Sequence, residues 1–290
     1  MKNPVTVASG TFGYGEEYAE LFDISRLGAI TVKGIRKEPC DGNPTPRIYE
    51  VPGGMLNAIG LQGPGASGFV ENYLPFLRAK NVPVIVNIWG TSVEGYAETA
   101  AELGGAEGVS ALEINVSCPN VKHGGASFGG DPKSVAAVVA AVREKVSPAM
   151  TLIAKLAPNV PDIKPFVRAA EDAGTDALAI SNTIPAMAID IEKRCPALAN
   201  TVGGLSGAAI HPAAVKLVWD AAGVAKVPVI GMGGIFTPQD AIEFLCAGAT
   251  AVAVGTANFI DPTTPLKVIE GIADYMTKHG FENVADIKIR

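Results

Sequence analysis

Polar side chains that could bind or react with a ligand recur at the ends of short apolar runs in this 290-residue chain. The residues are Ser9, Lys33, Asn87, Asn115, Lys155, Asn182 and Thr183, and Cys118 closely follows Asn115. Two lysines, several amides and one thiol, without a pair of carboxylates, suit the binding of a planar ligand with carbonyls and ring nitrogens better than they suit hydrolysis.

Two further runs end in glycines. One closes with Gly231-Met232-Gly233-Gly234 and the next with Gly255-Thr256. Because glycine has no Cβ, the backbone N–H groups of such loops can come close to an anion. The loops after the seventh and eighth strands of a β/α barrel often hold a phosphate. We therefore expect a phosphate site here, and the alternative is that the glycines only serve tight turns.

The sequence allows more than one role for each of Lys33 and Lys155. A lysine inside a barrel is costly unless it meets negative charge. A reduced flavin, which is anionic around N1 and the C2 carbonyl, would supply that charge. The alternatives are an ion pair at the rim of the barrel and a Schiff-base lysine of an aldolase.

Cys118 is the candidate base. A thiol has a reference pKa of about 8.5, so forming the thiolate at neutral pH costs about 2 kcal/mol, and a thiol can accept a proton from a weakly acidic C–H bond. The alternative is a small buried hydrophobic side chain. None of the three histidines, His123, His211 and His279, is spaced to form a defined dyad with it.

Eight apolar runs must position these groups. They cover residues 5–8, 29–32, 84–87, 112–115, 152–155, 177–180, 229–232 and 251–254. Near-continuous runs of this kind are typical of parallel strands that are covered on both faces. Helical stretches lie between them, with predicted starts at Thr91 (with Glu94), Asp131-Pro132, Thr237-Pro238 and Thr264-Pro265, and left-handed stops at Gly104, Gly174, Gly248 and Gly280.

This alternation predicts an α/β protein whose residues 1–290 form a single (β/α)8 TIM barrel. An open doubly wound sheet is the alternative. Two long connections, 34–63 and 182–211, follow the carboxyl ends of strands. We expect both to be insertions on the catalytic face, where they would form lids or substrate walls.

Composition excludes several classes of partner. The chain has 29 acidic and 23 basic side chains, a net charge of −6, and 48% apolar residues. These values disfavour nucleic acid and anionic membranes as partners. No apolar stretch approaches the roughly 20 residues that span a bilayer, and the first residues resemble no signal peptide, so we expect a cytoplasmic protein. Four cysteines without a Cys-x-x-Cys pair predict free thiols and no metal or iron–sulfur site.

Several ordered motifs resemble those of one family. They are Asn3-Pro4 with Ala8-Ser9-Gly10-Thr11, Gly42-Asn43-Pro44-Thr45-Pro46-Arg47, Asn57-Ala58-Ile59-Gly60-Leu61-Gln62, Asn115-Val116-Ser117-Cys118-Pro119-Asn120, Gly203-Gly204-Leu205-Ser206-Gly207 and Gly231-Met232-Gly233-Gly234. Together they resemble the catalytic subunits of class 1B dihydroorotate dehydrogenases over nearly the whole chain.

The resemblance implies a flavin enzyme of de novo pyrimidine biosynthesis that oxidises dihydroorotate to orotate on FMN. The residues it implies as FMN contacts are Ser9, Lys33, Gly34, Asn87, Asn115, Lys155, Gly207, Gly233, Gly234, Gly255 and Thr256. Those it implies for substrate are Lys33, Asn57, Ala58, Ile59, Gly60, Leu61, Asn115, Asn182 and Thr183. Cys118 would take the C5 proton while hydride leaves C6 for flavin N5. Ser181 replaces an apolar residue usual in the family, so it is left outside both sets.

The resemblance also implies a homodimer that associates with a subunit carrying FAD and a [2Fe–2S] cluster, as a heterotetramer that passes electrons to NAD. Three other functions stay open on the residues alone. They are a flavin oxidoreductase acting on another dihydropyrimidine, a flavin-free lyase that forms a Schiff base at Lys155, and a ligand-binding subunit without catalysis.

Overall fold

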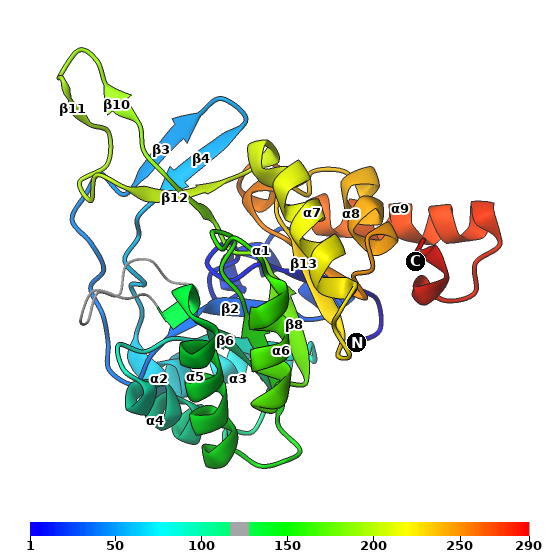
Figure 1. Ribbon diagram of the computed structural model, residues 1–290, viewed down its shortest axis with the longest axis horizontal. Helices are drawn as coiled ribbons and strands as arrows, with labels where there is room; N and C mark the ends of the chain where they lie inside the picture. Colours follow the sequence, from blue (N-terminus) through cyan, green and yellow to red (C-terminus); the bar gives the residue numbers. More distant parts are fainter. Residues whose placement is uncertain (117–127, 290) are drawn as a thin grey trace.

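The centre of the protein is an eight-stranded parallel barrel (Figure 1). The computed structural model describes residues 1–116 and 128–289. The barrel strands are Val5–Val7 (β1), Ile30–Ile35 (β2), Val84–Ile88 (β5), Val109–Asn115 (β6), Thr151–Lys155 (β7), Ala177–Ile180 (β8), Val229–Met232 (β13) and Ala251–Val254 (β14). Each overlaps one of the apolar runs, with ends that differ by up to three residues, so the eight predicted strands are confirmed.

Strand order identifies the barrel. The strands pair in the order β1-β14-β13-β8-β7-β6-β5-β2, so the first strand lies beside the last. Side chains join the two ends of this row: the hydroxyl of Thr6 on β1 donates to the carbonyl of Ala29 at 2.9 Å and lies 3.3 Å from the hydroxyl of Thr31 on β2. The sheet is therefore a nearly closed (β/α)8 barrel, as predicted, and the open doubly wound alternative is wrong.

Helices alternate with the strands and cover the barrel (Figure 1). They are Glu16–Ala19 (α1), Gly65–Asn72 (α2), Leu74–Ala79 (α3), Val93–Leu103 (α4), Pro132–Lys145 (α5), Lys164–Asp172 (α6), His211–Ala222 (α7), Pro238–Cys246 (α8) and Thr264–His279 (α9). Short 3-10 turns are Ile24–Arg26 (η1), Phe128–Gly130 (η2), Ala208–Ile210 (η3), Thr256–Phe259 (η4) and Val284–Ile287 (η5). Within the described ranges, every helix is too short or too polar to cross a membrane.

Helix ends follow the predicted signals at most positions. Asp131 caps α5 by accepting from the backbone N–H of Ser134, and Gly174, Gly248 and Gly280 all have the predicted left-handed backbone. For α4 the predicted cap Thr91 is wrong, and the predicted stop at Gly104 is right in position but not in its left-handed backbone. Its N-cap is Ser92, whose extended backbone lets its hydroxyl accept from the Gly95 N–H, and not Thr91. Gly104 has a right-handed φ of −67°. Glycine is favoured there for lack of space, because a Cβ would lie 2.7 Å from Val146 Cγ1.

The N-cap of α8 permits a direct stability test. Thr237 accepts from the Asp240 N–H, and the Asp240 carboxylate accepts from the Thr237 N–H at 2.8 Å. Thr237→Ala removes one half of this capping box and is expected to lower the free energy of unfolding by about 1 kcal/mol. Urea denaturation measures the loss. Thr277→Ala, at an exposed threonine near the end of α9, is the control and is expected to change the value by less than about 0.5 kcal/mol.

The two long connections form one structure over the barrel. Ile48–Val51 (β3) and Gly54–Asn57 (β4) come from the first, and Ile184–Ala186 (β9) and Gly203–Ser206 (β12) from the second. They pair as one antiparallel sheet in the order β3-β4-β12-β9. Both connections were predicted as insertions at this end of the barrel, and the structure places them there. Their pairing with each other was not predicted.

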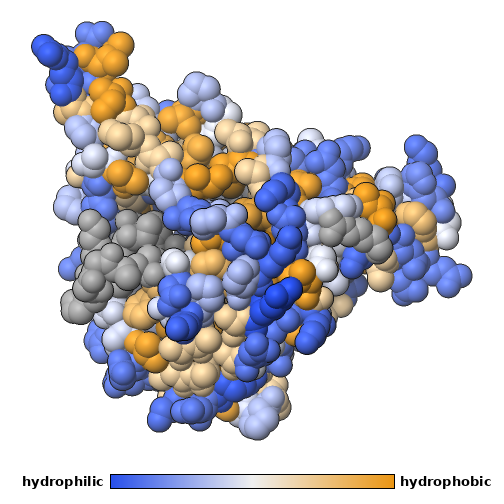
Figure 2. Space-filling model, viewed as in Figure 1, coloured by the Kyte–Doolittle hydropathy of each residue, from blue (hydrophilic) through white to orange (hydrophobic). Residues whose placement is uncertain are grey.

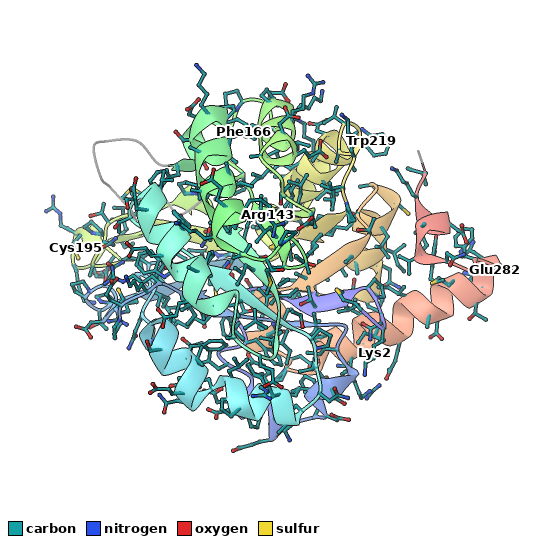
Figure 3. All side chains as sticks on the ribbon, turned by 90° about the horizontal axis from the view of Figure 1, so that it is seen from below. Lys2, Arg143, Phe166, Cys195, Trp219 and Glu282 are labelled. Atoms are coloured by element: carbon teal, nitrogen blue, oxygen red, sulfur yellow. The ribbon has the colours of Figure 1, made fainter. Side chains whose placement is uncertain are left out.

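A projecting arm continues from this small sheet. It contains the ribbon of Ile189–Asp190 (β10) and Cys195–Pro196 (β11). Figure 2 shows apolar and hydrophilic residues side by side on it, with Met187, Ile189 and Ile191 among the exposed apolar side chains. Cys195 is exposed at its outer end, on the opposite side of the molecule from Glu282 (Figure 3). Cys195, Cys40 and Cys246 are free thiols, as predicted.

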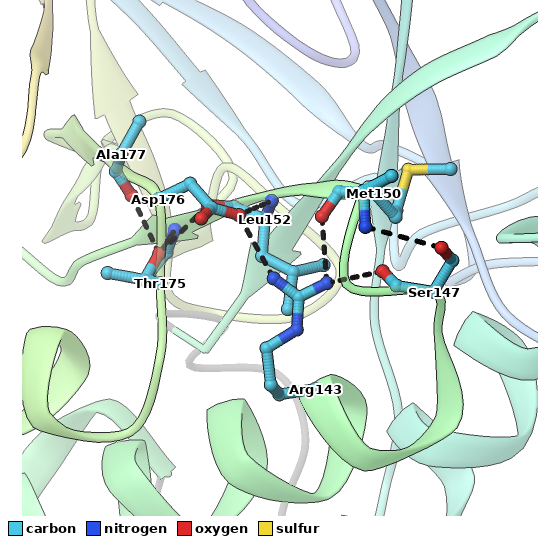
Figure 4. Close-up of polar contacts among 9 residues, drawn as sticks. Arg143, Ser147, Met150, Leu152, Thr175, Asp176 and Ala177 are labelled. Carbon is cyan, nitrogen blue, oxygen red and sulfur yellow. Dashed lines mark hydrogen bonds and ion pairs between the residues drawn. The ribbon is translucent and has the colours of Figure 1, made fainter.

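The amino ends of β7 and β8 are held by a separate polar network (Figure 4). Arg143 on α5 donates to the Asp176 carboxylate at 3.0 Å and to the Met150 carbonyl at 2.8 Å. The same carboxylate accepts from the Leu152 N–H at 2.8 Å, and the Thr175 hydroxyl donates to the Leu152 carbonyl at 3.0 Å. These contacts join a helix to two barrel strands at the end opposite to the insertions, so their role is to fix the scaffold.

Candidate functional site

A cavity of about 400 Å³ lies between the carboxyl ends of the barrel strands and the small sheet. This volume is in the range of small-molecule and cofactor sites. The predicted residues that line it are Ser9, Lys33, Gly34, Asn57, Ile59, Gly60, Leu61, Asn87, Asn115, Lys155, Asn182, Thr183, Gly207, Gly233, Gly234, Gly255 and Thr256. The fold therefore brings together, in one cavity, polar groups from strands that are far apart in the sequence.

One predicted residue lies outside this cavity, and one lies outside the described residues. Ala58 is buried in a small apolar cluster with Leu56 and Leu198 and does not line the cavity. Its neighbours along the chain face the cavity, because successive residues of an extended segment point in opposite directions. Cys118, like His123, lies outside the described residues. Ser181, which the sequence left outside the set, does line the cavity.

The floor of the site contains a carboxylate that the sequence did not predict. Glu113 on β6 is 3% exposed at its side chain, and its Oε1 lies 3.6 Å from Lys155 Nζ on β7. The same oxygen accepts a hydrogen bond of 2.6 Å from Nδ2 of Asn87 on β5. Lys155 therefore already meets negative charge from the protein, so the ion pair that the sequence left open for this lysine is present, within the barrel. The sequence does carry one signal for this carboxylate, because Glu113 is a charged residue within the apolar run 112–115.

Amide side chains form one wall of the cavity. Asn182 donates from Nδ2 to Asn115 Oδ1 at 3.1 Å, and its own Oδ1 accepts from the Thr183 N–H at 2.8 Å. Asn115 is fixed in turn, because the Tyr96 hydroxyl donates to its carbonyl at 2.8 Å. A Cβ at Gly204 would lie 2.0 Å from Thr183 Oγ1, so only glycine lets β12 approach this cluster. The wall presents preorganised groups for the carbonyls and N–H groups of a small ring.

Glycine-rich loops form the opposite side. Gly234 has a φ of +68°, and a Cβ there would lie 2.7 Å from His211 Cβ. The His211 ring nitrogen Nδ1 is 3.0 Å from the Gly233 carbonyl, which fixes the same loop from below. The Thr256 hydroxyl donates to Ser206 Oγ at 2.7 Å and so joins the loop after β14 to β12. The loops converge where an anionic tail can be bound by backbone N–H groups.

The mouth of the cavity is electropositive. Burial lowers the pKa of the Lys33 ammonium, and the nearby positive charge of Arg47 lowers it further. Arg47 is held in the first insertion, where its Nη1 donates to Gln62 Oε1 at 2.7 Å. A partly desolvated lysine beside a second cation is stabilised by negative charge, so this part of the cavity favours an anionic group such as a carboxylate.

The lining fits a flat, conjugated ring with a phosphate tail. Asn87 Oδ1 is buried without a hydrogen-bond partner among the described residues, so a ligand N–H would satisfy it. Met232 and Ala253 add apolar surface for the face of a ring. A polar edge, an apolar face and a glycine-lined anion site are thus combined in one cavity.

Two comparisons of the sequence with known proteins give the same family. A family model described as dihydroorotate dehydrogenase matches residues 1–276. The chain is 53% identical over 288 residues to the dihydroorotate dehydrogenase B (NAD(+)) catalytic subunit of Geotalea uraniireducens, covering 99% of this chain and 93% of the relative. The protein of the same name from Alkaliphilus metalliredigens is 52% identical, with 99% and 94% covered. That from Thermoanaerobacter pseudethanolicus is 51% identical, with the same coverage. The resemblance of the motifs is thereby confirmed.

Proposed function

Because this chain belongs to the dihydroorotate dehydrogenase family, we propose that its cavity binds FMN and dihydroorotate together. The chain is an oxidoreductase that converts dihydroorotate to orotate in pyrimidine biosynthesis. The observation that carries the proposal is the convergence of two lysines, the amide wall and the glycine loops on one cavity. The flavin-free lyase and the ligand-binding subunit without catalysis are set aside, since neither activity is that of the family.

The parts of the cavity divide between the two ends of FMN. The glycine loops would bind the phosphate through Gly207, Gly233, Gly234, Gly255 and Thr256. The polar floor and rim would hold the ring through Ser9, Lys33, Gly34, Asn87, Asn115 and Lys155. Bound there, FMN would supply a two-electron acceptor for hydride.

The same logic assigns the substrate contacts. Lys33 at the mouth would bind the carboxylate of dihydroorotate, and the amide wall would bind its ring carbonyls and N–H groups. The residues proposed for substrate are Lys33, Asn57, Ile59, Gly60, Leu61, Asn115, Asn182 and Thr183. Ala58 was also predicted, but its buried position supports only a role in packing.

Cys118 is proposed as the base that accepts the proton from C5 of dihydroorotate while the C6–H bond gives up hydride. The support is its place in the chain, three residues after Asn115 at the end of β6. A thiol suits this role because forming the thiolate at neutral pH costs only about 2 kcal/mol at the reference pKa.

Assembly and compartment extend the proposal. The relatives are named catalytic subunits of NAD-linked enzymes, which supports a partner subunit for this chain as well. We propose a homodimer that binds a subunit carrying FAD and [2Fe–2S], as a heterotetramer that reduces NAD.

We also propose a cytoplasmic protein, because the free thiols of Cys40, Cys195 and Cys246 fit a reducing compartment. One large core joins strands from both halves of the chain, which supports a single domain over residues 1–290.

The pKa of Lys33 predicts how substrate binding depends on pH. An anionic ligand binds the charged ammonium, so affinity for orotate is lost as pH rises through the pKa of Lys33, and this pKa lies below that of an ordinary lysine. Arg47→Gln removes the neighbouring charge and should move the loss of affinity to higher pH. Arg47→Lys keeps the charge up to about pH 9, because the ordinary pKa of lysine is about 10.4, and is the control over that range. Orotate titrations followed by the flavin spectrum between pH 7 and 11 measure both. A loss at the same pH in all three proteins would contradict this assignment.

Flavin release and substrate choice test the function itself. The purified chain is expected to be yellow and to release FMN, one per chain, on denaturation. Under anaerobic conditions dihydroorotate should bleach the flavin in one turnover, while dihydrouracil, which lacks the carboxylate, should react far more slowly. Fast bleaching by dihydrouracil would favour an oxidoreductase acting on another dihydropyrimidine. A colourless chain that does not bind added FMN would contradict the proposal.

A further inference from the structure

Glu113 has no part in the chemistry proposed above, although it lies directly beneath the cavity. Its side chain is 3% exposed, and it does not itself line the cavity, whereas its partners Asn87 and Lys155 do. Removing a carboxylate from water carries a large penalty unless the charge is paired and hydrogen-bonded. A charge kept in this position therefore points to an effect on the residues that contact the ligand.

The first effect is on the orientation of Asn87. A carboxylate can only accept hydrogen bonds, so the amide must turn its Nδ2 toward Glu113, where the observed distance is 2.6 Å. The amide oxygen is then left on the other side, buried and without a partner among the described residues. Glu113 thus makes Asn87 an acceptor for an N–H group of a ligand.

The second effect is on the charge of the floor. Lys155 Nζ donates to Ser9 Oγ at 3.2 Å and lies 3.6 Å from Glu113 Oε1. The Thr6 and Thr31 hydroxyls that face the same barrel interior are neutral. The positive charge of Lys155 is therefore balanced from below by Glu113, and a ligand that gains negative charge is stabilised less than it would be by an unpaired lysine.

We propose that Glu113 is a positioning residue that lowers the reduction potential of the bound flavin, an inference that rests on the proposed binding of FMN in this cavity. Uptake of two electrons and one proton gives the flavin ring one negative charge; in the enzyme, the electrons and the proton arrive together as hydride from dihydroorotate. Lys155 stabilises that charge and Glu113 opposes it. A lower potential favours the onward transfer of the electrons.

Reduction potentials of the FMN-bound protein test this role. Glu113→Gln is neutral, has nearly the same shape and can still accept from Asn87. It should raise the potential, with the affinity ratio of reduced to oxidised flavin increasing about tenfold, equivalent to about 30 mV for a two-electron couple. Glu113→Asp keeps the charge at a greater distance from Lys155, so a smaller rise in the potential is expected.

Thr31→Val is the control: it removes a buried hydroxyl from the same barrel interior and should leave the potential unchanged. Equilibration of each protein with a reference dye, using xanthine and xanthine oxidase as the reductant, gives the values.

The outcomes separate the two proposals. The order wild type, Glu113→Asp, Glu113→Gln, from lowest potential to highest, supports the role of Glu113. Unchanged or lower potentials in either variant would overturn it while FMN binding stood. If Glu113→Gln does not fold, the rise in Glu113→Asp decides alone. Failure of the unaltered chain to bind FMN would instead remove the proposed cofactor.

Discussion

Cys118→Ser is expected to bind FMN and orotate as the unaltered chain does, yet to be reduced by dihydroorotate roughly 10²–10⁴-fold more slowly at neutral pH, the usual contribution of a general base. A serine hydroxyl ionises far less readily than a thiol, so the proton on C5 loses its acceptor. Anaerobic stopped-flow mixing, followed by bleaching of the flavin band, measures the rate without any partner subunit.

A matched substitution separates chemistry from structure. Cys195→Ser makes the same change on the exposed arm, far along the chain from β6, and should leave the reduction rate within about twofold of wild type, as surface changes remote from a site usually do. A rate in Cys118→Ser equal to that of Cys195→Ser would remove Cys118 from the mechanism. A loss of flavin from Cys118→Ser would instead show that the residue is needed for binding.

Lys155→Met is expected to have the largest effect on stability. It leaves the Glu113 carboxylate, 3% exposed, without its cation. Breaking a buried ion pair by removing one partner lowers the free energy of unfolding by about 3–5 kcal/mol. The variant should also purify with little flavin, because Met cannot donate a hydrogen bond to N1 and the C2 carbonyl of the ring, which are acceptors in the oxidised flavin as well. Urea denaturation of FMN-free protein measures the stability, and the visible spectrum measures the flavin content.

A double variant tests the cause of that loss. Lys155→Met combined with Glu113→Gln removes both charges, so most of the lost stability should return while the flavin content stays low. The two substitutions are in contact, so their effects on stability should not add. Equal stability of Lys155→Met and the unaltered chain, within about 0.5 kcal/mol, would show that the pair of Lys155 and Glu113 carries no net energy.

The barrel could be predicted from the sequence because of how parallel strands are buried. Each strand is covered on both faces, so it reads as a short apolar run, and the residue that ends the run marks the mouth of the barrel. Caps such as Asp131 and Thr237 carry their own local signals. At α4, Thr91 and Ser92 both have a suitable hydroxyl, and only the backbone conformation decides that Ser92 is the cap.

The features that were missed depend on contacts between distant segments. The role of Glu113 depends on its contacts with Asn87, 26 residues away, and with Lys155 on the next strand. These contacts follow from strand register, which cannot be read from composition. The small sheet pairs Asn57 with Gly204, 147 residues apart, so neither insertion carries the signal alone. Ala58 was grouped with its neighbours by motif, whereas the alternation of an extended chain turns it away from the cavity.

A crystal structure of the yellow, purified chain with orotate would test the central claim most directly. The account predicts a flavin in the cavity, with its phosphate at Gly233, Gly234 and Thr256, its pyrimidine edge at Asn87 and Lys155, and orotate between the ring and the sulfur of Cys118. Density for the flavin at any other place, or a Cys118 sulfur turned away from a fully occupied orotate, would contradict it.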